Sequence, residues 1–120
     1  MGRYEDLKVW QLSHRLALDA RRQALEFPRD ERYELTSQLR RALLSVPTNL
    51  VEGNGLWGPR NYLRHVRIAI GSLQEAEYLF RYAHDASYID DASFRDLSAR
   101  LVHIRVLLYR LAKALNRAAS

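Results

Sequence analysis

A row of polar side chains along the segment from Asp30 to Gly53 is the most unusual chemical feature of the sequence. Its five members recur at spacings of three or four residues: Gln38, Arg41, Ser45, Asn49 and Glu52. At about 100° per residue around a helix, they share one sector beside an apolar sector. Amide, guanidinium, hydroxyl and carboxylate groups in one row can form a hydrogen-bonded network or bind a polar ligand. A simple solvated face would instead carry mainly Lys and Glu.

This polar stripe has two interpretations. In the functional one, Arg40, Arg41, Asn49 and Glu52 belong to a surface that binds a ligand or RNA. In the structural one, the stripe residues form a hydrogen-bonded network inside the bundle or between subunits, because burying Arg41 or Glu52 without a partner would cost several kcal/mol. We favour the structural interpretation, since a buried polar network can fix helix register and oligomeric state.

A first candidate nucleic-acid surface begins after a glycine-rich loop. Arg60, Arg64 and Arg67 follow one another at helical spacing, opposite the apolar side of the expected helix. Aromatic residues accompany them: Trp57 just before, and Tyr78 and Tyr82 further along the same face. Phosphate contact and base stacking require this combination of arginine and aromatic rings. The same face also carries Gly71, which instead indicates close approach of another backbone, so it is either an RNA surface or a subunit contact.

A second candidate surface lies near the C-terminus, where no acidic residue follows Leu97. Its outward-facing cations are Arg110, Lys113 and Arg117. The whole chain carries 19 basic and 14 acidic residues, a net charge of +5, which favours polyanionic partners. Arginine predominates, and it forms bidentate phosphate contacts that lysine cannot form. Two simpler explanations remain open: a GC-rich genome would favour arginine, and cations near a helix C-terminus complement the helix dipole.

The sequence carries no pattern typical of an enzyme or a metal protein. It contains no cysteine, which excludes thiol catalysis, disulfides and cysteine-ligated metals. The histidines, His14, His65, His84 and His103, form neither Glu-x-x-His nor His-x-x-x-His pairs. Ser45 and Ser72 lack a nucleophile-elbow motif, and the glycine-rich loop lacks the phosphate-binding lysine. We therefore expect no catalytic residue, no metal and no cofactor.

Apolar periodicity predicts four helices over residues 5–26, 30–53, 59–86 and 91–117. On the first helix the expected apolar seam is Leu7, Trp10, Ala17, Ala20, Ala24 and Phe27, with Leu12 and Leu16 beside it. On the second helix it is Leu35, Leu39, Ala42, Leu43, Val46 and Leu50. On the third helix it is Tyr62, Val66, Ala69, Leu73, Ala76, Phe80 and Ala83. Asp30 is the expected N-cap of the second helix, and Asp90 or Asp91 that of the fourth. Pro47 should kink the second helix without ending it. Long helices joined by short loops predict one domain, residues 1–120, folded as an all-α, antiparallel up-and-down four-helix bundle. No apolar run is long enough for a signal peptide or a membrane span, so we expect a cytoplasmic protein.

The segment Glu31–Gly53 reads E-R-x-x-L-T-x-Q-x-R-R-A-x-x-S-V-P-x-N-L-V-E-G. This string resembles the signature of the four-helix bundle family that includes the 23S rRNA intervening-sequence proteins. The flanking motifs are similar to the same family: Y-E-D-L-K-V-W-Q over residues 4–11, F-P-x-x-E-R over residues 27–32 and G-S-L-x-E over residues 71–75. The resemblance thus covers nearly the whole chain.

The resemblance implies a homo-oligomer, specifically a ring-shaped pentamer, and no enzymatic activity. Accessory proteins of diversity-generating retroelements look related, which implies RNA and a reverse transcriptase or other protein as partners. The leading expectation is therefore a non-enzymatic oligomer that associates with RNA through arginine-rich surfaces. The alternative is a ring that serves as a protein-interaction scaffold and binds no nucleic acid.

Overall fold

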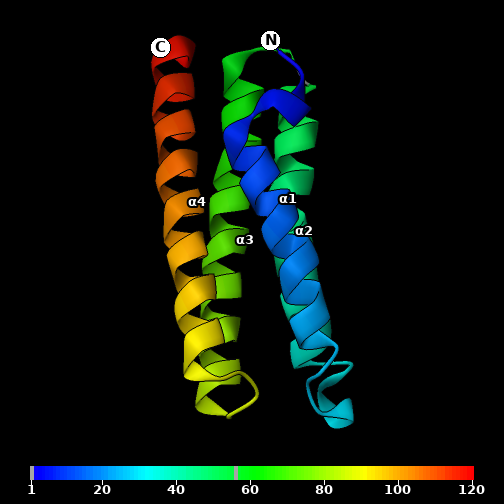
Figure 1. Cartoon of the computed structure of the whole chain (residues 1–120). Coiled ribbons are helices and arrows are strands. Elements are labelled where there is room, and N and C mark those ends of the chain that lie inside the picture. The colour runs from blue at the N-terminus through cyan, green and yellow to red at the C-terminus, as the bar shows by residue number, and fades with distance from the viewer. Residues whose placement is uncertain (1, 56) are drawn as a thin grey trace.

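The computed structural model describes residues 2–55 and 57–120, and these form four long helices that lie side by side (Figure 1). Their bounds are Lys8–Ala24 for α1, Leu35–Asn54 for α2, Pro59–Asp85 for α3 and Asp91–Ala119 for α4. Two short 3₁₀ turns, η1 (Tyr4–Asp6) and η2 (Arg29–Glu31), precede α1 and α2. The all-α fold with four helices, expected from the periodicity, is confirmed, and the described residues contain no strand.

The core follows the apolar seam predicted for the second and third helices. On α3 the buried seam residues are Tyr62, Val66, Ala69, Leu73, Ala76, Phe80 and Ala83. On α2 they are Leu35, Leu39, Ala42, Leu43, Val46 and Leu50. Because every predicted seam residue on these two helices is buried, α2 and α3 form the centre of the bundle.

The α1 seam differs from the expected one. Its buried residues are Val9, Ser13, Leu16, Ala20 and Ala24, whereas Leu7, Trp10 and Ala17 are only partly buried. The buried position 13 is a serine whose hydroxyl donates to the Trp10 carbonyl at 3.1 Å. This local hydrogen bond satisfies the hydroxyl, so a polar residue can occupy a core position.

The expected start of the second helix, with Asp30 as its N-cap, is wrong. Residues 28–34 form consecutive short-range turns, and α2 begins at Leu35 after Glu34. Tertiary contacts explain the difference: Tyr88 donates its hydroxyl proton to the Glu31 carboxylate at 2.9 Å, and Thr36 donates to the Ala24 carbonyl. The segment before α2 is therefore held against α1 and the α3–α4 turn instead of continuing the helix.

The other predicted helix boundaries agree more closely with the structure. α2 continues through Pro47 as expected and ends at Asn54, one residue beyond the predicted end. Asp90 is the N-cap of α4, because its carboxylate accepts the Ser93 N–H at 2.7 Å. Gly58 precedes α3 with φ of +84°, a left-handed conformation that favours glycine.

The arrangement of the helices places both candidate basic surfaces at one end of the molecule. α3 packs against α2 and α4, while α1 packs against α2 and also contacts α4. The N-terminal end of α3 and the C-terminal end of α4 both lie at the top of Figure 1. No helix in the described parts of the chain is both long and apolar enough to cross a membrane.

Candidate functional site

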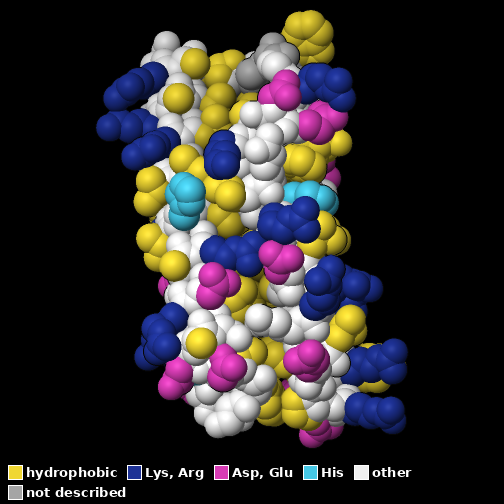
Figure 2. Space-filling model, in the orientation of Figure 1, with side chains coloured by type: hydrophobic (Ala, Val, Ile, Leu, Met, Phe, Trp, Pro, Cys, Tyr) yellow, Lys and Arg dark blue, Asp and Glu magenta, His cyan; other side chains and the backbone are white. Residues whose placement is uncertain are grey.

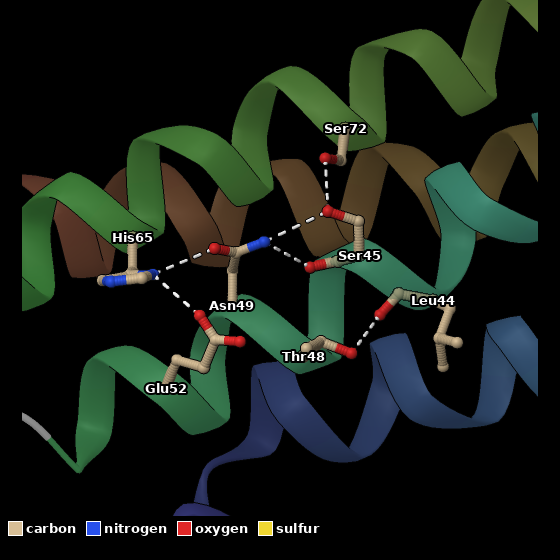
Figure 3. A network of polar contacts seen from close by, with 7 residues as sticks. All are labelled: Leu44, Ser45, Thr48, Asn49, Glu52, His65 and Ser72. Atoms are coloured by element: carbon tan, nitrogen blue, oxygen red, sulfur yellow. Dashed lines mark hydrogen bonds and ion pairs between the residues drawn. The ribbon is translucent and has the colours of Figure 1, made fainter.

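Three members of the polar stripe form a hydrogen-bonded network between α2 and α3 (Figure 3). The Asn49 amide donates to the Ser45 carbonyl at 2.9 Å and to the Ser45 hydroxyl at 3.1 Å. The Ser45 hydroxyl lies 2.8 Å from that of Ser72 on α3. On its other side, the Asn49 carbonyl oxygen lies 3.0 Å from Nδ1 of His65, also on α3. The structure thus joins three of the five stripe residues, Ser45, Asn49 and Glu52, in a network that also includes two α3 residues that the stripe did not reveal.

The direction of each hydrogen bond around Asn49 follows from the groups involved. A backbone carbonyl can only accept, so the Asn49 nitrogen must face Ser45 and its oxygen must face His65. The His65 Nδ1 atom must then carry a proton and donate it to Asn49. The Glu52 carboxylate lies 3.5 Å from the same Nδ1. His65 is buried, with 9% of its surface exposed, so Asn49 provides the hydrogen bond that its burial requires.

Gly53 lets α2 and α3 approach closely beside this network. A Cβ atom at position 53 would lie 2.8 Å from the Tyr62 ring and 3.0 Å from the His65 Cβ. Such contacts are too short for real side chains, so any larger residue would push the helices apart. By contrast, a Cβ at Gly71 would meet nothing within 4 Å in the described chain. The close helix approach within the subunit is thus at Gly53.

The remaining two stripe residues lie outside the network. Gln38 and Arg41 are exposed and line a shallow depression of about 250 Å³ together with Ser45, Ser72 and Glu75. The stripe therefore divides into a helix-joining part, Ser45 to Glu52, and a surface part, Gln38 and Arg41. The partners of the Ser45 hydroxyl are the Asn49 amide and the Ser72 hydroxyl. Neither of these groups is a histidine that could activate Ser45 as a nucleophile.

The cations of α4 separate into paired and unpaired groups. Arg100 forms an ion pair with Asp19 of α1 at 2.9 Å, and Arg105 pairs with Glu77 of α3. Arg110, Lys113 and Arg117 are all exposed, and none of them pairs with a carboxylate in the described chain. Figure 2 shows Lys and Arg side chains gathered over this end of α4, at the upper left. We call these three residues the α4 basic patch.

The predicted basic face of α3 is also exposed, but its two tyrosines lie apart from its arginines. Arg60, Arg64 and Arg67 lie in the first third of α3 and have no carboxylate partner among residues 2–55 and 57–120. Tyr78 lies roughly 27 Å from Arg60 along the helix axis at the normal rise per residue. Tyr78 and Tyr82 instead line a small depression with Arg81 and Asp85. Arginines and tyrosines on this helix therefore do not form one compact site.

A larger depression between α1 and α2 combines arginines with an aromatic ring and was not predicted. Its volume is about 520 Å³. Arg21, Arg32, Arg40 and Arg41 line it, together with Tyr33. Only Arg40 and Arg41 were considered as binding residues from the sequence. Arg21 belongs to a different helix and Tyr33 to a turn, so no single periodic pattern connects them.

The family comparison covers most of the chain. Residues 5–110 match the model of the 23S rRNA-intervening sequence protein family. No curated protein sequence matches the chain. The matched region begins in η1 and includes all of α1, α2 and α3, together with α4 as far as the first cation of its basic patch. The chain therefore belongs to the 23S rRNA-intervening sequence protein family.

Proposed function

We propose that this protein is a non-enzymatic homo-oligomer of antiparallel up-and-down four-helix bundles that associates with RNA in the cytoplasm. The oligomer is a pentamer, as the resemblance to the family implies. The observation that carries the RNA proposal is the α4 basic patch, because its three cations are exposed and have no carboxylate partner in the described residues. Cations that are not neutralised within the fold remain available for phosphate contact.

The position of the α3 arginines supports the same proposal. Arg60, Arg64 and Arg67 lie at the end of the bundle where the α4 basic patch also lies (Figure 1). Six exposed cations at one end of each subunit would be repeated around an oligomer, and repeated weak contacts give strong binding when they engage together. Contacts of this kind are made mainly to phosphates, so they provide affinity with little base specificity.

The outer face of α4 supports assembly of several subunits. Val102, Val106 and Tyr109 recur at helical spacing and are 51%, 41% and 53% exposed. A continuous apolar stripe on a surface helix is typical of a contact with another protein surface. The stripe ends at Tyr109, directly before Arg110 of the α4 basic patch, so assembly through this stripe would bring basic patches of neighbouring subunits near one another.

The experiment compares RNA binding by wild type and two triple variants. Arg110→Gln/Lys113→Gln/Arg117→Gln and Arg60→Gln/Arg64→Gln/Arg67→Gln are titrated against a labelled structured RNA by fluorescence anisotropy at several salt concentrations. Each variant should bind more weakly, and the slope of log affinity against log salt should fall by about 2 to 3 because three phosphate contacts are lost.

A matched variant controls for loss of charge alone. Arg15→Gln/Arg22→Gln/Arg95→Gln removes three exposed arginines outside both basic surfaces and should retain most of the binding. Native mass measurement confirms that all proteins assemble equally. Equal weakening by the control and the patch variants would reject a specific basic surface. Absence of RNA binding by wild type would reject the RNA proposal and favour the protein scaffold.

A further inference from the structure

We infer that the depression between α1 and α2 binds one unpaired nucleotide of a single-stranded RNA segment. This inference rests on the proposed association with RNA and identifies the form of RNA that a separate site recognises. The site, which we call the α1–α2 depression, is formed by residues of both helices and of the turn that precedes α2.

The charge of the α1–α2 depression suits an anionic ligand. Arg21, Arg32, Arg40 and Arg41 line it, and no carboxylate does. Within residues 2–55 and 57–120, none of these guanidinium groups forms an ion pair. Arg41 also borders a separate depression that contains Glu75. Four unneutralised guanidinium groups around one hollow are a suitable site for phosphate, since arginine binds it in a bidentate manner.

The α1–α2 depression also offers apolar surface to a ligand. Ala17, Leu18 and Leu44 contribute to it, and Leu18 and Leu44 are 42% and 60% exposed. Tyr33 also lines it, with 85% of its surface exposed, and the centre of its ring lies 5.9 Å from the Arg32 guanidinium carbon. Neither the leucines nor the tyrosine ring is needed for the core. Figure 2 shows basic side chains projecting beside hydrophobic ones along the lower right edge.

A nucleotide combines the two kinds of group that this site accepts. Its base can cover the leucines and stack on Tyr33, while its phosphate meets the arginines. The volume of about 520 Å³ falls within the range of roughly 300–1,000 Å³ that is usual for small-ligand sites. A base within a duplex is stacked on its neighbours and cannot cover these leucines or stack on Tyr33. The occupant must therefore be unpaired.

The test uses a labelled 12-nucleotide RNA of mixed sequence without self-complementarity and the same RNA annealed to its complement. Tyr33→Ala should weaken binding of the single strand by about five- to tenfold, because one base loses its stacking partner. Duplex binding should change less than twofold. Tyr33→Phe keeps the ring and should bind the single strand within about twofold of wild type. Arg21→Gln/Arg40→Gln should lower the salt slope for the single strand by about 1.4.

Tyr78→Ala is the matched control, because it removes an exposed ring that lies outside the α1–α2 depression. It should leave single-strand binding unchanged. The inference is overturned if Tyr33→Ala has no effect, or if it weakens duplex and single strand equally. It is also overturned if the variants change the oligomeric mass, since the depression would then be a subunit contact. In these cases binding of structured RNA through the α4 basic patch can persist; loss of all RNA binding by wild type would reject both proposals.

Discussion

Replacing Gly53 by alanine tests how closely α2 and α3 must approach beside the polar network. The added methyl group would lie 2.8 Å from the Tyr62 ring and 3.0 Å from the His65 Cβ. Tyr62 is 2% exposed, so its ring has no free space into which it can move. The helices must separate or the ring must leave its rotamer, and overpacking of this kind costs about 1–3 kcal/mol.

An opposing effect reduces this cost without reversing it. Alanine is favoured over glycine by up to about 1 kcal/mol within a helix, but α2 ends at Asn54, where the gain is smaller. We therefore expect Gly53→Ala to destabilise the protein by about 1–2 kcal/mol. For a chain of 120 residues, each kcal/mol lowers the melting temperature by roughly 3–6 °C.

Gly71→Ala provides the matched control, because it makes the same chemical change in α3 where a Cβ meets nothing within 4 Å. It should raise the stability by up to about 1 kcal/mol. Thermal denaturation at equal protein concentration, followed by circular dichroism, measures both variants. The reasoning fails if Gly53→Ala is as stable as wild type or more stable. Destabilisation by Gly71→Ala with loss of oligomeric mass would instead place Gly71 at a subunit contact.

Two further predictions concern the polar network and a helix cap. Asn49→Ala removes the hydrogen-bond acceptor of buried His65 and should lower the free energy of unfolding, measured by urea denaturation, by about 1–3 kcal/mol. Thr48→Ala changes an adjacent exposed residue and should alter stability by less than about 0.5 kcal/mol. Equal effects of the two variants would contradict a structural role for the network. The Ser93 N–H holds the pKa of the Asp90 carboxyl below its usual value. The Asp90 carboxylate therefore stabilises the fold fully at a pH above its pKa in the unfolded state. This stabilisation is lost as the pH falls through the pKa of Asp90 in the folded state. Asp90→Ala should therefore lower the melting temperature at pH 7, and its difference from wild type should shrink below about pH 4; a constant difference would contradict the assignment.

The sequence predicted the helices best where the apolar periodicity is unbroken and local. The seams of α2 and α3 follow unbroken apolar periodicity, and all their predicted residues are buried. On α1 the seam passes through Ser13, which apolar periodicity excludes, although its own hydrogen bond makes it compatible with burial. The N-cap at Asp30 failed because the preceding turn is fixed by distant contacts, including that between Tyr88 and Glu31.

The sequence predicted the members of the polar network on α2 but not those on α3. His65 and Ser72 are seven residues apart and flank the α3 seam, so a comparison of polar positions beside both seams could have paired them with Ser45 and Asn49. The rotation of one helix against the other decides such a pairing, and periodicity alone does not provide it. The sequence pattern could not predict the α1–α2 depression either, because its arginines become neighbours only when α1 packs on α2.

The most direct test of the central proposal is the salt dependence of RNA binding by the wild-type protein. Affinity for a labelled structured RNA is measured by anisotropy from about 50 to 200 mM salt, at a protein concentration where native mass measurement shows one oligomeric species. Binding through repeated phosphate contacts predicts a linear fall of log affinity with log salt, with a slope steeper than about −3. Binding that is absent at the lowest salt, or that does not change with salt, would contradict an RNA-associating function of the basic surfaces.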